Sequence, residues 1–124
     1  MSSFIFIVAT SDYTANSSRV CPIINTDSSF TNLSSNIVNN ADATTTITWS
    51  WSVFTDNGTT TDGLNLGDNA NFTLNIASLN IIAFGSIPLS RNSGKAFYGF
   101  CGKNTATDVP IILSNTNFSK CFSV

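Results

Sequence analysis

The sequence predicts an all-β fold, a single-domain antiparallel β-sandwich that is jelly-roll-like and has about eight short strands. The helix-favouring residues Glu and Gln are absent, and apolar residues recur at every second position in several short runs. Gly, Asn and Asp stand between these runs, where they favour tight turns. With 124 residues and a hydrophobic fraction of 42%, the chain suffices for one core, so we expect one domain over residues 1–124.

The segment from Thr44 to Thr55 has the clearest strand pattern and contains both tryptophans. Strand side chains alternate between two faces, which places four apolar residues on one face and hydroxyl residues on the other. The apolar residues are Ile47, Trp49, Trp51 and Val53. Since each tryptophan buries roughly 150–250 Å², we expect this strand in the middle of the core.

A continuous apolar run near the N-terminus is expected to form a first strand that is covered on both faces. It consists of Phe4, Ile5, Phe6, Ile7 and Val8. An uncovered strand of this composition would aggregate, so we hypothesise that it pairs with a sheet edge, in this fold or in a neighbouring subunit during assembly. The segment lacks the basic residues and the length of a signal peptide.

Between these two strands the sequence predicts little regular structure. Residues 11–19 are polar and are expected to form a loop, and residues 20–24 form a second strand, which Pro22 confines to an edge or a strand start. Residues 30–38 combine helical spacing of apolar residues with poor helix formers. We expect an irregular excursion there, with at most one turn of helix, followed by a turn at residues 39–42.

The second half of the chain repeats the pattern of short strands and turns. Asp56-Asn57-Gly58 is a tight-turn sequence, because Asn and Gly tolerate the positive φ that hairpin turns need. The expected strands are residues 72–76, 79–84, 96–101, 109–113 and 118–124.

Low charge excludes several classes of function. The net charge is −2 and only 10% of the residues are charged, so the clustered Lys and Arg of a nucleic-acid interface are lacking. No apolar run approaches the ~20 residues that span a bilayer, so membrane insertion is not expected. With no His and no Glu, the usual catalytic triads are excluded, and we expect neither an enzyme nor a bound cofactor.

Aspartates in neighbouring turns are the best candidate ligands for a metal. Asp56, Asp62 and Asp68 offer the oxygen atoms that Ca²⁺ prefers, although their spacing differs from the EF-hand loop and no bidentate Glu is present. Turn aspartates also hydrogen-bond their own backbone, which explains the same residues without a metal. The sequence leaves both interpretations open.

Three cysteines leave one thiol over if two of them pair. A disulfide between Cys101 and Cys121 would close a loop of about 20 residues and stabilise the fold by roughly 3 kcal/mol, with Cys21 free to bond a partner chain. Pairing of Cys21 with Cys101 is an alternative, and three buried thiols are another. Either disulfide arrangement predicts covalent multimers.

These features favour a non-enzymatic structural β module that associates with copies of itself, as in a surface filament, coat or matrix. Low charge leaves little repulsion between copies, so the expected partners are further copies, in a homo-oligomer or polymer. The alternative is a carbohydrate-binding, lectin-like module with glycans as partners. Its candidate residues are Asn, Asp and Gly on loops and the polar-tipped aromatics Tyr13 and Tyr98. Either function suits an extracellular or cell-surface location.

Overall fold

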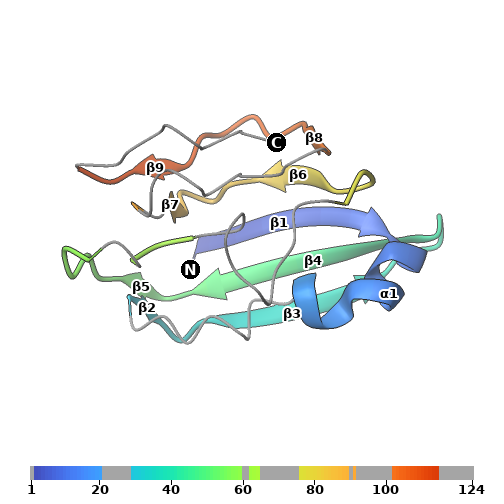
Figure 1. Ribbon diagram of the computed structural model, residues 1–124, viewed down its shortest axis with the longest axis horizontal. Coiled ribbons are helices and arrows are strands. Elements are labelled where there is room, and N and C mark those ends of the chain that lie inside the picture. The colour runs from blue at the N-terminus through green and yellow to red at the C-terminus, as the bar shows by residue number, and fades with distance from the viewer. Residues whose placement is uncertain are drawn as a thin grey trace.

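The computed structural model describes residues 2–20, 29–59, 62–64, 76–89, 91 and 102–114 (Figure 1). Its elements are β1 (Ser2–Ala9), α1 (Thr10–Val20), β2 (Phe30–Thr31), β3 (Ser34–Asn39), β4 (Thr44–Trp51), β5 (Val53–Phe54), β6 (Asn80–Ala83), β7 (Pro88–Leu89), β8 (Lys103–Asn104) and β9 (Ile111–Ile112). Strands β3, β4, β1, β6 and β8 form a five-stranded sheet in this order, while β2 pairs with β5 and β7 pairs with β9. The described chain is mostly strand, with one short helix and three sheets, which confirms the all-β prediction at this level.

The core lies on one face of the five-stranded sheet, where β1 and β4 pair antiparallel along their length. Phe4 lies opposite Trp49 and Phe6 lies opposite Ile47, and all four side chains are buried. The Trp49 ring meets the rings of Phe4 and Phe6 nearly edge-on, with centroids 5.7 and 6.2 Å apart. Trp51 is buried as well, so both tryptophans are core residues, as the alternation predicts.

The alternation along β4 ends earlier than the sequence predicts, and Val53 is not in the core. β4 ends at Trp51, and Val53 is 54% exposed in the short strand β5. Across the hairpin, Asn32 has a left-handed backbone with φ 56°, and it lies where the β3–β4 ladder gives way to the β2–β5 ladder. Beyond this interruption Phe54 packs against the core, with its ring centroid 5.3 Å from that of Phe30.

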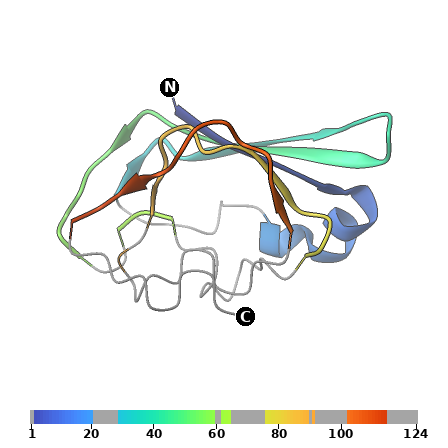
Figure 2. The same ribbon diagram turned by 90° about the horizontal axis from the view of Figure 1, so that it is seen from above.

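β1 is a central strand of the sheet, paired with β4 on one side and with β6 on the other. The expectation that both of its faces are covered holds for the core face only. Phe4, Phe6 and Val8 are fully buried there, whereas Ile5 and Ile7 on the opposite face are half-buried. Figure 2 shows α1 on one side of this sheet and no described segment on the other side of β1, β3 and β4.

Residues 11–19, expected to form a loop, lie in the helix α1, so that prediction is wrong. The helix begins directly after β1, and the Thr10 amide donates to the carbonyl of Ala43 at 2.8 Å. Asp12 stands in the first turn, where the helix dipole favours a negative charge, and Tyr13 packs against the core. Tertiary packing of this kind stabilises a helix whose residues are poor helix formers on their own. Among the described residues, no helix is long and apolar enough to span a membrane.

The irregular excursion expected at residues 30–38 is wrong as well, because this segment contains β2 and β3. β3 pairs antiparallel with β4 without a shift, and a turn within residues 40–43 joins them close to the predicted position. Pairing with the strongly patterned β4 decides the conformation of a segment whose own pattern is weak.

Two of the expected late strands fall among the described residues. Residues 79–84 contain β6, as predicted, whereas residues 109–113 are strand only in the two residues of β9. Of the strand expected at residues 20–24, Val20 lies in α1, and of the strand expected at 72–76, Ile76 is described but belongs to no strand. The rest of these two segments and the strands expected at 96–101 and 118–124 lie outside the described residues.

Candidate functional site

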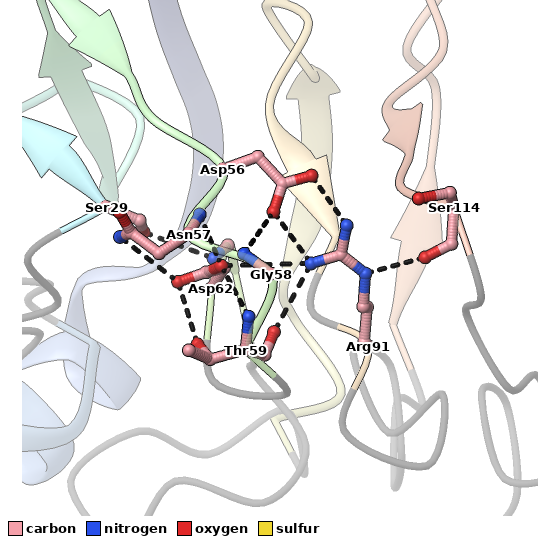
Figure 3. A network of polar contacts seen from close by, with 9 residues as sticks. Ser29, Asp56, Asn57, Gly58, Thr59, Asp62, Arg91 and Ser114 are labelled. Carbon is pink, nitrogen blue, oxygen red and sulfur yellow. Dashed lines mark hydrogen bonds and ion pairs between the residues drawn. The ribbon is translucent and has the colours of Figure 1, made fainter.

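The two buried charged side chains among the described residues are Asp62 and Arg91, which are 2% and 9% exposed. Together with Asp56 they form the group that we call the Asp–Arg cluster (Figure 3). Asp56 and Arg91 are 35 positions apart, so the cluster joins the loop after β5 to the chain just after β7.

The carboxylate of Asp62 organises its own loop. Its Oδ2 accepts hydrogen bonds from the amides of Asn57 and Thr59 at 2.8 and 3.0 Å, and its Oδ1 accepts one from the Thr59 hydroxyl at 2.9 Å. Burial raises the pKa of the Asp62 carboxyl, but the hydrogen bonds from Thr59 and Asn57 outweigh burial and hold the pKa below its ordinary value. Asp62 therefore remains ionised, with donors around both of its oxygens.

The guanidinium of Arg91 attaches this loop to the rest of the structure. It donates to both carboxylate oxygens of Asp56, from Nη1 to Oδ1 at 2.8 Å and from Nη2 to Oδ2 at 2.6 Å, in a bidentate arrangement. Nη1 also lies 3.7 Å from Oδ2 of Asp62, and Nε donates to the carbonyl of Ser114 at 2.6 Å. The hydrogen bonds from Arg91 and from the Gly58 amide hold the pKa of the Asp56 carboxyl far below its usual range.

The charges of the Asp–Arg cluster suit the attachment of loops to one another. A general acid or base works best with a pKa near the operating pH. Both carboxylates have lowered pKa values, and the hydrogen bond to Asp56 raises the pKa of the Arg91 guanidinium. All three groups thus keep their charges at neutral pH and hold the loops in place.

The structure brings together two of the three aspartates that are candidate ligands for Ca²⁺. Asp56 and Asp62 both contact the guanidinium of Arg91, which supplies the positive charge that a cation would otherwise bring. Asp68 lies outside the described residues. Within the described ranges, no group of three His, Cys, Asp or Glu residues is placed to hold a metal ion. The three-residue Ca²⁺ site stays a prediction.

The face of the sheet opposite the core, which we call the outer face, carries no charged side chain along β1, β3 and β4. Its residues are Ser3, Ile5, Ile7 and Ala9 on β1, Thr44, Thr46, Thr48 and Ser50 on β4, and Ser34, Asn36 and Val38 on β3. Polar groups on this face bond one another, as Ser3 Oγ and Ser50 Oγ do at 3.0 Å. The Asn40 side chain donates to the hydroxyls of Thr44 and Thr46 at 3.0 and 2.8 Å. The outer face is therefore a hydroxyl-rich surface with little charge to hold water or repel a neighbour.

The two edges of the five-stranded sheet differ in length and charge. At one edge, β3 has six residues, of which none is charged and none is proline, and in the described chain it pairs only with β4. At the other edge, β8 has two residues, includes Lys103 and runs parallel to β6. An exposed edge is a template for a further strand, and short or charged edges oppose such pairing. The β3 edge is therefore the candidate site for contact with another chain.

The N-terminal strand predicted to take part in assembly lies inside the sheet. The residues from Phe4 to Val8 belong to β1, which pairs with both β4 and β6 in the same chain. The backbone of this stretch is therefore already paired on both sides within its own chain. A role of residues 4–8 in assembly stays a prediction.

The remaining candidate residues are placed as follows. Cys21, Cys101 and Cys121 lie outside the described residues, so neither the disulfide nor the free thiol is tested. Of the aromatics proposed for glycan binding, Tyr13 packs against the core and Tyr98 lies outside the described residues.

Sequence reasoning missed both Arg91 and the β3 edge. No local pattern marks Arg91 as a member of a cluster, because its partner Asp56 is 35 positions away. β3 does carry a weak signal, since Ile37 and Val38 are strand-favouring residues directly before a turn. Comparison with known proteins adds no function: no known family matches the sequence, and no curated protein or solved structure matches it.

Proposed function

We propose that this chain is a non-enzymatic structural β module that associates with copies of itself, as a subunit of a surface filament, coat or matrix. The observation that carries the proposal is the uncharged outer face together with the edge strand β3, which pairs only with β4 among the described residues. Charged side chains on exposed edges and a net charge away from zero normally keep copies of a β protein apart. Here β3 and the outer face carry no charged side chain and the net charge is −2, so little electrostatic repulsion opposes close packing of copies.

A second exposed surface supports the same proposal. Val109, Ile111 and Ile112 are 76%, 46% and 49% exposed, and the last two form β9. Neighbouring strand residues point to opposite faces, so β9 exposes an apolar side chain on each face, and such side chains are available for contact with another copy.

The finer fold in this proposal is a jelly-roll-like antiparallel β-sandwich that forms one domain at residues 1–124. A sheet with one apolar face must pack that face against another layer, and a second sheet is the common solution in all-β proteins. An extracellular or cell-surface location is part of the proposal, because such assemblies are built there.

Sedimentation velocity and electron microscopy of the purified chain test the proposed function. We expect oligomers or ordered polymers whose size rises with protein concentration, measured with and without a reductant to separate covalent from non-covalent association. A monomer at every concentration would contradict the proposal. If that monomer bound a defined sugar on a glycan array, the lectin-like alternative would replace it.

A further inference from the structure

The β3 edge presents a defined set of backbone groups. The amide of Asn40 donates to the carbonyl of Thr44 at 2.8 Å, which makes these two opposed residues a hydrogen-bonded pair. Such pairs recur at every second position of an antiparallel ladder, and the β3–β4 register runs without a shift. The even-numbered residues of β3 therefore direct their N–H and C=O groups to β4. The odd-numbered residues direct theirs outward, and these are Ser35, Ile37 and Asn39.

The usual protections of an exposed edge are lacking in β3. Edge strands are commonly kept from pairing by a lysine, a proline, a bulge or a very short length. β3 has six residues without charge or proline, and its register with β4 shows no bulge. The opposite edge, by contrast, is the two-residue β8 with the exposed Lys103. Among the described residues, the sheet is thus protected at the β8 edge and unpaired at the β3 edge.

We propose that β3 pairs with β3 of a second copy of this chain, antiparallel and about a two-fold axis at Ile37, an inference that rests on the proposed self-association. In this register Ile37 lies opposite its counterpart, and Ser35 of each copy lies opposite Asn39 of the other. Each of these pairs exchanges two hydrogen bonds. Moving the axis by one residue leaves either Asn39 or Ser35 without a counterpart in β3, so the axis at Ile37 satisfies the most backbone groups.

We assign a second copy of this chain as the partner because the β3 edge is complementary to itself. The outward-facing residues are spaced symmetrically about Ile37, so the edge matches its own two-fold mate in both spacing and direction. Neither β3 nor the outer face carries a charge that would oppose this approach. The five-stranded sheet would then continue from one copy into the other.

The side chains agree with this register. Ile37 is half-buried and lies opposite Ile47 of β4, so two copies of Ile37 meet at the axis beside the apolar core. Val38, which is 47% exposed on the outer face, lies opposite Asn36 of the second copy. Pairing therefore covers apolar surface as well as backbone groups.

A two-fold contact closes after two copies, which makes the β3 pair a dimer contact. A filament or coat needs at least one further contact elsewhere on the surface. The dimer dissociation constant is thus the quantity that tests the proposed β3 contact.

The substitution Ile37→Pro tests the contact with little effect on the fold. Residue 37 does not use its N–H in the β3–β4 ladder, and proline is tolerated in edge strands whose N–H faces outward. The variant loses the central N–H of the proposed pair in both copies, so we expect the dimer dissociation constant to rise about tenfold or more by sedimentation. Ile37→Ala keeps the amide and should show a smaller change.

Hydrogen exchange of the unmodified chain gives a second readout that does not depend on any variant. The outward amides of Ser35, Ile37 and Asn39 should exchange slowly at high concentration and fast on dilution. Those of Asn36 and Val38, which bond β4, should exchange slowly in both conditions.

The outcomes separate this inference from the proposed function. If the chain associates but the outward amides stay unprotected and both variants associate equally, the β3 contact is wrong while self-association stands. If the chain is monomeric at every concentration, both are wrong. If Ile37→Pro does not fold, the exchange pattern alone decides.

Discussion

The two halves of the five-stranded sheet, on either side of β1, are built differently. In the regular half, β1, β4 and β3 pair antiparallel without a shift over eight and six residue pairs. In the irregular half, β1 pairs with β6 across a shift between Ile5 and Phe6, and β6 pairs with β8 in parallel over two residue pairs. In the part of the chain that the structure describes, the regular half ends in the unpaired β3 edge, and the irregular half ends in a short edge with a lysine.

Side-chain hydrogen bonds support the irregular half where the backbone ladder is short. The carboxylate of Asp108 accepts hydrogen bonds from the amides of Phe84 and Gly85, both at 2.8 Å. The hydroxyl of Thr105 donates to the side-chain oxygen of Asn80 at 3.1 Å. The difference shows that a long regular ladder can end in an edge to which another strand can pair, whereas the short ladder of β6 and β8 depends on side-chain hydrogen bonds as well.

The largest expected effect concerns the regular half. Trp49→Ala removes a buried side chain that contacts Phe4 and Phe6, so the free energy of unfolding should fall by ~3–5 kcal/mol. Urea denaturation measures this. Val53→Ala is the control. Because Val53 is 54% exposed, this substitution should lower the free energy of unfolding by less than about 0.5 kcal/mol. Equal losses in the two variants would show that the burial pattern of the hairpin is misplaced.

The next effect concerns the irregular half. Gly85 has φ 59°, and a Cβ at this position would overlap the backbone of Ser3 in β1. Gly85→Ala should therefore lower the free energy of unfolding by roughly 2–4 kcal/mol, from backbone strain and a forced shift of the turn after β6.

Gly58→Ala is the matched control for Gly85. Gly58 has φ 77°, but an added Cβ there meets nothing within 4 Å, so the loss should be about 1 kcal/mol from strain alone. If the free energy of unfolding falls equally in Gly85→Ala and Gly58→Ala, the close approach of the turn to β1 does not add to the effect of Gly85→Ala.

A smaller, pH-dependent effect is expected at Asp108. The amide of Phe84, and then that of Gly85, hold the pKa of the Asp108 carboxyl below its usual value. The unfolded chain, with a pKa of about 3.9, binds more protons at low pH, so this stabilisation is present above that pH and is lost as pH falls through the folded pKa.

Asp108→Asn should therefore destabilise the protein at neutral pH and lose most of that effect in acid. Denaturation curves at several pH values measure the difference, with the exposed neighbour in Thr107→Ala as a control near zero. A difference that stays constant down to strongly acidic pH would exclude the charge of Asp108 as its cause.

The smallest expected effect is a gain in stability from a substitution in the turn between β3 and β4. Ala43 has φ 62°, a conformation that glycine adopts without strain, so Ala43→Gly should raise the free energy of unfolding by about 0.5–1 kcal/mol. Ala41→Gly in the same turn removes no such strain and should be neutral or destabilising, as thermal unfolding will show. A loss in both variants would argue against strain at Ala43.

Much of the regular half is encoded locally. The period-two pattern of residues 44–51 determined a strand and its buried face, because alternating side chains can bury their apolar members only as a strand. The apolar run from Phe4 to Val8 determined a second strand, and the Asn-rich stretch at residues 39–42 indicated the turn into β4. Local patterns of this kind contain the information that a strand needs for its own conformation.

Other features were decided only by the tertiary structure. Helix α1 forms from poor helix residues because Tyr13 packs against the core. Val53 leaves the core because the ladder is interrupted at Asn32, next to Thr31, the residue that pairs with Val53. The Asp–Arg cluster depends on residues 35 positions apart, and the sequence indicated only that its aspartates lie in turns. Likewise, the sequence indicated that β1 pairs with a sheet edge but not with which strands, and among the described residues β3 is the long strand that pairs on one side only. Which strand pairs on both sides and which pairs on one is set by contacts between distant segments, and no local pattern contains that information.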